Sequence, residues 1–322
     1  MFVFGALPQG ERSAPLESIM PDSSHLLNGR RLGVVGKGGA GKSTTVVLLA
    51  SALRRQGHTV CVLDADSANQ GFHGALGIDT PPIPLLDFFG GMVFSGGAVT
   101  CPMDDPIPLT GAELDLEHLA PVYCPRNQEG IFLLTAGKIV DKGPGAGCDG
   151  PISKIARDVR IRVGGVVPVT LVDFKAGFED VSRGVITGFD WVIVVVDPTK
   201  AAIQMAIDMK EMVNQIKARR QPATAHLVRS DLVDAANRIF REARVRDVLV
   251  VLNRIRDREM LEYLRVQLSR GGVQVLGVIP EDPAIAISWL VGAPLGAVSL
   301  GSAETIVDVL ESAESKYATT EQ

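Results

Sequence analysis

Residues 36–44 read Gly36-Lys37-Gly38-Gly39-Ala40-Gly41-Lys42-Ser43-Thr44, and this stretch satisfies the pattern G-x-x-x-x-G-K-[ST] of a phosphate-binding loop. Its glycines let backbone N–H groups approach phosphate oxygens without a Cβ in the way. Lys42 places a positive charge on the β- and γ-phosphates, and the Ser43 hydroxyl is a ligand for Mg²⁺. We therefore predict that all nine residues contact a nucleotide.

The residues around this loop support the prediction. A short apolar run, 32–35, leads into the loop as a strand. Behind the loop, apolar residues recur at the spacing of one helix face: Val46, Leu49, Ala50 and Leu53. Gly57 is a suitable residue to end that helix. A strand, a glycine loop and a helix together aim a helix N-terminus at an anion.

Further apolar runs alternate with helical patterns along the chain. The runs cover residues 59–63, 169–172, 191–196, 248–252 and 273–279. Continuous Val, Ile and Leu are typical of strands buried on both faces of a parallel sheet. We expect a doubly wound α/β fold with helices on both faces, and ligands at the carboxyl ends of the strands. Polar residues follow these runs: Asp64, Asp66, Asp173, Asp197, Asn253 and, after Pro280, Glu281 and Asp282.

The composition limits the classes of function. The 322 residues are 46% hydrophobic with a net charge of −5, which argues against a general nucleic-acid binder. Four cysteines are too few for a disulfide scaffold, so we expect a reducing cytoplasm. No apolar run is long enough to span a membrane.

We expect one nucleotide-binding domain over residues 30–316. Residues 1–29 are rich in proline and serine and are predicted to be a loose extension, within which Met20 is a second candidate start, and 317–322 a tail. Residues 81–130 are rich in proline and glycine, which favours loops and short helices over the core. Residues 224–244 predict an additional helix.

The order of these motifs resembles the Min/Par/nitrogenase iron protein superfamily, whose deviant phosphate loop carries the extra lysine found here as Lys37. Within that group the chain is most similar to the maturation ATPases that assist nickel insertion into carbon monoxide dehydrogenase. The likeness covers about residues 31–315. Five stretches carry it: 63–69 (LDADSAN), 133–138 (LLTAGK), 173–179 (DFKAGFE), 251–254 (VLNR) and 277–283 (GVIPEDP).

The resemblance implies roles for particular residues. Lys37 would reach across a homodimer to the partner's phosphates, and Asp66 would orient the attacking water. Asp173 would stand beside Mg²⁺, which removes the cost of an unpaired carboxylate at the end of a buried strand. Gly177 would offer its N–H to the γ-phosphate, and Asp64 would bond near Mg²⁺ or the loop. The resemblance thus implies ATP and Mg²⁺ as cofactors, with Ser43, Asp66 and Asp173 on the Mg²⁺ side.

The identity of the base can be argued from one run. Relatives specific for guanine read it with Asn-Lys-x-Asp, whereas this chain has Asn253-Arg254-Ile255-Arg256. Because an arginine cannot accept a hydrogen bond from guanine, adenine is favoured. Asn253 and the turn Pro280-Glu281-Asp282 are expected near it.

The chain departs from the nickel-insertion ATPases at their Cys-x-Cys motif. The matching stretch, 143–150, ends in Cys148-Asp149-Gly150, so glycine stands where the second thiol belongs. Nitrogenase iron proteins would need a cysteine where Asp180 stands. Cys148 and its counterpart could bind a transition metal at a twofold interface with help from Asp149, or Cys148 could simply lie in an interface turn. Cys61 lies within a predicted strand and is expected in the core, whereas Cys101 and Cys124 lie in the irregular segment and match no motif. The five histidines show no metal-ligand spacing and are expected to be ordinary surface or core residues.

Three functions fit these observations. The first is an ATP-driven homodimeric switch that hydrolyses ATP and helps a client metalloenzyme acquire its metal centre. The second is a Min/Par-type positioning ATPase, which would need a basic amphipathic tail for a membrane or a basic surface for DNA; residues 302–322 and the charge balance provide neither. The third is a reductase similar to the nitrogenase iron protein. The first is favoured, with no nucleic-acid or membrane partner.

Overall fold

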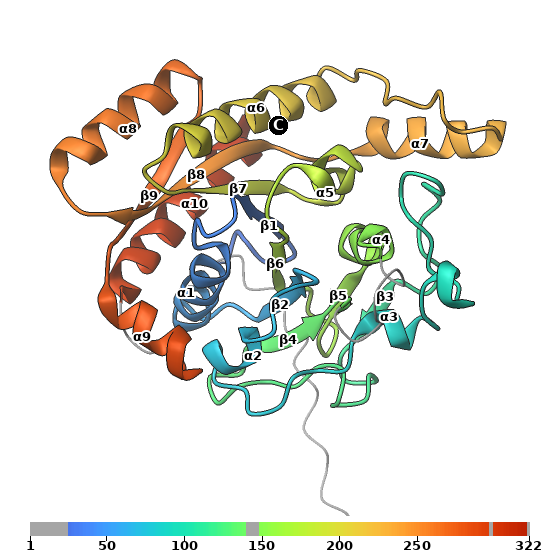
Figure 1. Ribbon diagram of the computed structural model, residues 1–322, viewed down its shortest axis with the longest axis horizontal. Coiled ribbons are helices and arrows are strands. Elements are labelled where there is room, and N and C mark those ends of the chain that lie inside the picture. The colour runs from blue at the N-terminus through green and yellow to red at the C-terminus, as the bar shows by residue number, and fades with distance from the viewer. Residues whose placement is uncertain (1–24, 140–147, 296–298, 321–322) are drawn as a thin grey trace, which may run out of the picture.

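The computed structural model describes residues 25–139, 148–295 and 299–320. Its centre is a seven-stranded sheet in the order β4-β2-β6-β1-β7-β8-β9, with every neighbouring pair parallel (Figure 1). The strands are β1 (Arg31–Gly36), β2 (Val60–Ala65), β4 (Phe132–Thr135), β6 (Val169–Phe174), β7 (Trp191–Val196), β8 (Asp247–Ile255) and β9 (Gln274–Pro280). The predicted doubly wound α/β fold is confirmed.

Helices cover both faces of the sheet because successive strand residues point to opposite sides. In β1, Leu32 and Val34 join the core beneath α1 and α10, while Val35 joins the core beneath α4, α6 and α8. The long helices are α1 (Lys42–Arg55), α4 (Gly150–Asp158), α6 (Lys200–Lys217), α7 (Ser230–Glu242), α8 (Arg258–Arg270), α9 (Pro283–Val291) and α10 (Leu300–Thr320). The helix predicted within 224–244 is α7.

One strand of the sheet was not predicted. β4 has only four residues and pairs with β2, Cys61 lying opposite Phe132. So short a run, set directly after an irregular segment, carries no periodicity of its own. The predicted strands are otherwise present with ends shifted by a few residues, most of all in β8, where Arg254 has a φ of 60° beside a register shift.

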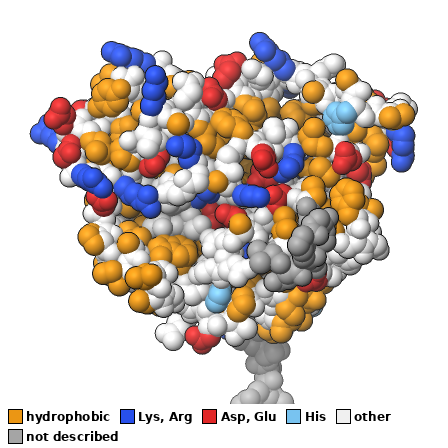
Figure 2. Space-filling view, in the orientation of Figure 1, with side chains coloured by type: hydrophobic (Ala, Val, Ile, Leu, Met, Phe, Trp, Pro, Cys, Tyr) orange, Lys and Arg blue, Asp and Glu red, His pale blue; other side chains and the backbone are white. Residues whose placement is uncertain are grey.

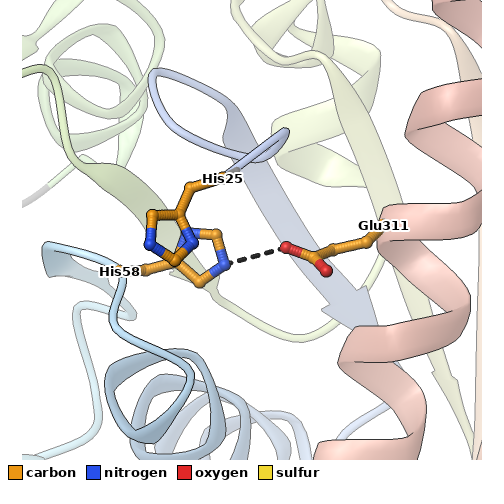
Figure 3. Close-up of side chains that lie close together, drawn as sticks. All are labelled: His25, His58 and Glu311. Atoms are coloured by element: carbon orange, nitrogen blue, oxygen red, sulfur yellow. Dashed lines mark hydrogen bonds and ion pairs between the residues drawn. The ribbon is translucent and has the colours of Figure 1, made fainter. Parts of the chain in front are cut away.

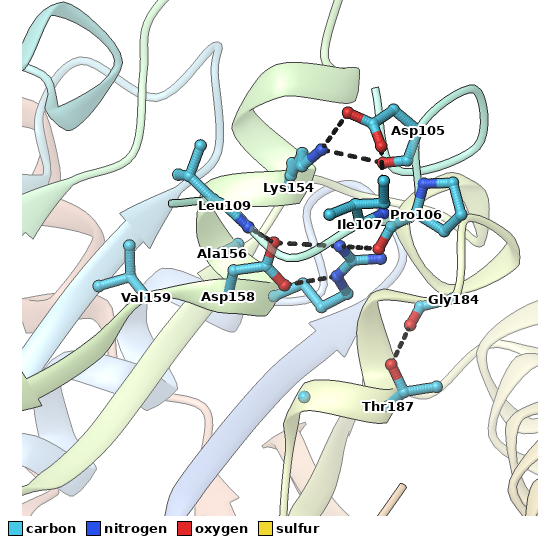
Figure 4. Close-up of polar contacts among 12 residues, drawn as sticks. Asp105, Pro106, Ile107, Leu109, Lys154, Ala156, Asp158, Val159, Gly184 and Thr187 are labelled. Atoms are coloured by element: carbon cyan, nitrogen blue, oxygen red, sulfur yellow. Dashed lines mark hydrogen bonds and ion pairs between the residues drawn. The ribbon is translucent and has the colours of Figure 1, made fainter. Parts of the chain in front are cut away.

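The segment 81–130 consists of loops and three short elements: α3 (Leu85–Phe88), η1 (Val93–Ser95) and β3 (Glu113–Asp115). Another short helix, α2 (Phe72–Ala75), lies just before it. β3 pairs with β5 (Arg160–Arg162) in a separate two-stranded sheet. Polar contacts fix the segment to α4 (Figure 4): the Lys154 ammonium lies 3.0 Å from the Asp105 carboxylate, and Arg157 donates to the Pro106 carbonyl at 2.9 Å.

The C-terminal helix α10 packs an apolar stripe on α1 and β9. Its last turns continue to Thr320, and the ring of Tyr317 lies 6.0 Å from that of Trp191. Two further short helices, α5 (Glu179–Ser182) and η3 (Val185–Gly188), follow β6. Within the described residues, no helix combines the length and hydropathy that crossing a bilayer requires.

Helix α9 has no buried residue. Figure 2 shows hydrophobic side chains gathered over it at the lower left of the molecule, where Ile287, Leu290 and Val291 are 60%, 84% and 66% exposed. A cluster of this kind marks a contact surface more often than a scattered apolar residue does.

Candidate nucleotide-binding site

The phosphate-binding loop connects β1 to α1, and two of its glycines are required by space. Gly36 has a φ of 154°, and a Cβ there would lie 2.7 Å from the Val195 carbonyl oxygen. Gly41 has a φ of 96°, and a Cβ there would collide with the Asn253 side-chain amide. Both backbone conformations are rare for residues with a side chain. The packing of β7 and β8 against the loop therefore explains two of the glycines in the motif.

The two lysines of the loop have different surroundings. Lys42 is buried, and its ammonium donates to the Lys37 carbonyl at 3.4 Å. Lys37 is half-buried, and its ammonium has no hydrogen-bond or ion-pair partner within the described residues. Lys42 is thus directed into the loop, whereas the Lys37 ammonium makes no such contact with the described residues.

Ser43 and Asp173 form the centre of the site. The Ser43 hydroxyl donates to Asp173 Oδ2 at 2.5 Å and accepts from the Asn69 amide at 3.0 Å. Asp173 is fully buried at the end of β6, and its second oxygen, Oδ1, has no hydrogen-bond partner in the described part of the chain. Burial above all, and then the Asp64 carboxylate, raise the pKa of Asp173 to about 8. A buried unpaired oxygen beside a hydroxyl is a suitable pair of hard donors for Mg²⁺, so the residues present fit that ion.

The neighbouring strand supplies a second buried carboxylate. Asp64, at the end of β2, lies opposite Asp173 in the sheet and accepts from the Lys138 ammonium at 2.6 Å. Burial raises the pKa of Asp64 to about 6, against the effect of Lys138. Asp64 also accepts from the backbone N–H of Asp66 at 3.0 Å. Asp64 therefore orders the loop that carries Asp66.

Two residues expected around the γ-phosphate lie at the same edge of the sheet. The Asp66 carboxylate is half-buried and accepts from the Ala68 N–H at 3.0 Å. The Gly177 N–H, with φ of 106°, donates to the Gly36 carbonyl at 3.2 Å. The loop after β6 is thus bonded directly to the first residue of the phosphate-binding loop.

The residues expected near the base lie farther along the same edge. Asn253 is buried behind the loop and donates to the Ala40 carbonyl at 2.7 Å. Glu281 forms an exposed ion pair with Arg256, and Asp282 caps α9 by accepting from the Ala284 N–H. Asn253 therefore holds the loop in this structure, and contact of these residues with a base stays a prediction.

Sequence reasoning missed several residues of the site. Lys138 and Asn69 fall within the stretches that carry the family resemblance, and that resemblance was the signal available for them. No feature of the sequence indicated a role for Trp289. Its indole N–H, on α9, donates a hydrogen bond to the Thr44 hydroxyl at 2.9 Å, and the two residues are 245 positions apart in the chain.

The region of the incomplete Cys-x-Cys motif has a spatial explanation. Residues 143–147 lie outside the described part of the chain, whereas Cys148 is half-buried and its sulfur accepts from the Gly150 N–H at 3.3 Å. A Cβ at position 150 would lie 2.6 Å from the sulfur of Cys101. Cys101 thus fills the space that a second thiol at 150 would need. The Asp149 carboxylate bonds the Lys175 ammonium at 2.6 Å.

Comparison with known proteins relates this chain to nucleotide-binding proteins. The profile of the CobQ/CobB/MinD/ParA nucleotide-binding domain matches residues 34–295. An ATP-binding protein of Methanocaldococcus jannaschii is 32% identical over 56% of this chain and 72% of its own length. The carbon monoxide dehydrogenase accessory protein CooC of Rhodospirillum rubrum is 27% identical over 58% of this chain and 70% of its own. An iron–sulfur cluster carrier protein of Pyrococcus horikoshii is 27% identical over 59% of this chain and 57% of its own.

Solved structures share the fold at low sequence identity. The cell division ATPase MinD of Pyrococcus furiosus has a TM-score of 0.54 and 18% identity, covering 88% of this chain and 99% of its own. MinD of Pyrococcus horikoshii, solved with Mg-ADP, has a TM-score of 0.52 and 18% identity, covering 88% and 98%.

Proposed function

The chain belongs to the CobQ/CobB/MinD/ParA nucleotide-binding family, and from this premise we propose that it is a Mg²⁺-dependent ATPase. We propose further that it acts as an ATP-driven homodimeric switch in the assembly or activation of a client enzyme's metal centre. The observation that carries the ATPase proposal is the buried Asp173 carboxylate: its Oδ2 accepts from Ser43 of the phosphate-binding loop, and its Oδ1 has no hydrogen-bond partner among the described residues.

The roles of the chain's own groups follow from their positions. Lys42 and the N-terminus of α1 bind the phosphates, and Ser43 and Asp173 would hold Mg²⁺. When bound, that ion would neutralise the charge that develops on the β- and γ-phosphates. The family resemblance implies that Asp66 orients a water for attack, and the bond from the Asp66 N–H to Asp64 would hold its loop in place for that role. The Gly177 N–H would exchange its bond to the Gly36 carbonyl for the γ-phosphate, which makes the loop after β6 sensitive to hydrolysis.

The dimer is supported by two features next to the loop. Lys37 has a free ammonium within the described residues, and a second copy facing the nucleotide would give it an anionic partner. The exposed apolar face of α9 is joined to the loop through Trp289 and Thr44, and burial of that face by the second copy would stabilise the closed state. ATP would then close the dimer and hydrolysis would open it.

The role in metal-centre assembly is supported by the relatives. CooC is named as an accessory protein of carbon monoxide dehydrogenase, and the Pyrococcus horikoshii relative as an iron–sulfur cluster carrier. A transition metal held by Cys148 at the dimer interface stays a prediction, as does the cytoplasmic location. The apolar stripe of α10 is packed on the core, so it does not provide the membrane-binding tail that a Min-type protein would need.

Light scattering and phosphate release test the switch. We expect Mg-ATP to convert the wild-type chain to a dimer that hydrolyses ATP slowly. Lys37→Ala should still bind ATP but remain monomeric and lose hydrolysis, whereas Lys316→Ala, at an exposed position on α10, should behave as wild type. A Lys37→Ala chain that dimerises and hydrolyses normally would refute the shared-nucleotide dimer.

A genetic experiment tests the client. We expect a strain that lacks the gene to lose the activity of one metalloenzyme while that enzyme's polypeptide persists without its metal. Unchanged metalloenzyme activities across such a strain would refute the assembly role and leave the ATPase proposal intact.

A further inference from the structure

Three potential metal ligands meet at the edge of the sheet opposite the nucleotide site. His58 lies in the loop before β2, at the amino end of the strand whose carboxyl end carries Asp64. His25, from the turn before β1, and Glu311, from α10, come to the same place (Figure 3). One ligand atom from each of the three residues lies within 4.8 Å of the other two. Positions 25, 58 and 311 have no regular spacing, so this cluster could not be predicted from the sequence.

We propose that His25, His58 and Glu311 form a binding site for Zn²⁺ or a related divalent transition-metal ion. Two imidazoles and one carboxylate are a known zinc ligand set, and imidazole is a suitable donor for zinc, copper and nickel.

The surroundings of His58 are the strongest argument. The ring is fully buried, and both of its nitrogens face oxygens: Nδ1 lies 3.2 Å from Asn28 Oδ1, and Nε2 lies 3.0 Å from Glu311 Oε1. Two oxygen acceptors would require a doubly protonated ring. A neutral ring can donate to only one of the two oxygens.

A metal ion resolves this conflict. A neutral His58 donates from Nδ1 to Asn28 and keeps the lone pair of Nε2 for the ion. Glu311 then becomes the second ligand instead of an acceptor from His58. The bond from Nδ1 to Asn28 is the outer hydrogen bond by which proteins commonly fix the tautomer of a metal-bound histidine.

The separations suit a tetrahedral ion. Ligand bonds of about 2.0–2.2 Å place the ligand atoms of a tetrahedral site roughly 3.3–3.5 Å apart. The distance from His58 Nε2 to Glu311 Oε1 is 3.0 Å, and the largest separation within the set is at most 4.8 Å. Binding therefore needs the ligand atoms to move by about 1 Å. The side chains of His25 and Glu311 are partly exposed, which leaves them room to shift toward the buried His58.

The third ligand is held close by its own segment. The rings of His25 and His58 have centroids 4.6 Å apart, and Leu27, fully buried, anchors the turn that carries His25. The His25 ring packs closely on Gly57, which has a φ of 91°. A Cβ on residue 57 would lie only 3.3 Å from the nearest atoms of that ring. A bound ion would tie the turn before β1 to α10, two segments almost 290 residues apart in sequence.

The test uses the full chain, without a histidine tag and without nucleotide, dialysed against a chelator. We expect wild type to bind one equivalent of Zn²⁺ in competition with a chromophoric chelator, and Zn²⁺ to raise its Tm. His25→Ala and Glu311→Gln should weaken binding at least about tenfold and lose the rise in Tm. The matched controls are His118→Ala, at an exposed histidine, and Glu304→Gln, on the same helix; both should bind as wild type.

Cobalt identifies the ligands. Co²⁺ at this site should show ligand-field bands without the charge-transfer band that thiolates produce, and Cys148→Ser should leave the spectrum unchanged. Equal zinc binding by wild type, His25→Ala and Glu311→Gln would overturn the proposal. So would a thiolate band that disappears in Cys148→Ser, or a wild-type chain that binds no zinc. Asn28→Ala, which keeps all three ligands, should bind zinc more weakly than wild type but still do so.

Discussion

Replacing Asp173 by asparagine should make the nucleotide-free chain more stable and the enzyme inactive. The pKa of Asp173 is raised from 3.8 to about 8, chiefly by burial. Between those values the folded chain binds a proton that the unfolded chain releases. Stability contributed by this group therefore falls as pH rises from 3.8 to 8 and is level above 8. Asparagine is neutral at every pH and has nearly the same shape.

The magnitude follows from the pKa. At pH 7 the shift spans about three units, which at 1.36 kcal/mol per unit gives an upper limit of roughly 4 kcal/mol. The new amide must find an acceptor beside Ser43, which costs about 1 kcal/mol. We expect Asp173→Asn to raise the free energy of unfolding by about 1–3 kcal/mol at pH 7, and thus Tm by a few degrees. The difference should be small at pH 5 and largest at pH 8 and above.

Thermal unfolding with and without Mg-ATP measures both effects. Wild type should gain about 2.7 kcal/mol at a ligand concentration near 100 Kd, and Asp173→Asn much less, with phosphate release abolished. Asp208→Asn, at an exposed position on α6, should match wild type throughout. If Asp173→Asn melted below wild type at pH 8 without nucleotide, the inference that the buried carboxylate opposes folding would be wrong.

Three further outcomes are expected. Lys42→Ala should weaken ATP binding by about 10–100-fold in calorimetry, because it removes a charge-assisted contact to phosphate; unchanged affinity would contradict its place in the site. ATP should change the fluorescence of Trp289, whose indole bonds Thr44, and Trp289→Phe should abolish that change while Trp191 supplies a constant background. If a metal binds the ATP-bound dimer through Cys148, Cys148→Ser should remove it in elemental analysis; equal metal content in both would end that idea.

Most of the fold was predictable because the deciding signals are local. A strand buried on both faces is a continuous apolar run, and the phosphate-binding loop is defined by nine consecutive residues. Strand β4 was not predicted because a run of four residues is too short to show a hydrophobic periodicity, and its place in the sheet depends on pairing with β2 alone. The ends of the strands were misplaced wherever tertiary pairing extends a strand beyond its apolar run, as in β8.

The structure places the residues predicted for the site along one edge of the sheet, but the contacts between them were not predictable from the sequence. Asp64 and Asp66 were expected from their position after a strand, but nothing local shows that Lys138 crosses to bond Asp64. Asn253 was expected to face a base, and the structure shows its amide bonded to the back of the loop at Ala40. Such contacts join residues more than 70 positions apart, and they depend on how strands are ordered in the sheet.

The glycine at position 150 shows how far a motif can mislead when it is read along the chain alone. In sequence it is a missing ligand, which suggests a site that has lost half its thiols. In space the position is already occupied, because the sulfur of Cys101 lies where the side chain of residue 150 would begin.

A cysteine restored at 150 would therefore collide with Cys101 unless Cys101 became smaller at the same time. Gly150→Cys alone should destabilise the chain by about 1–3 kcal/mol, as overpacking does. The double change with Cys101→Gly, which removes both the sulfur and the Cβ that would lie 2.7 Å away, should recover part of that loss, which denaturant unfolding of the single and double variants would measure. Equal stability of the two would show that the turn around Cys148 yields freely, and that the space at 150 does not explain its glycine.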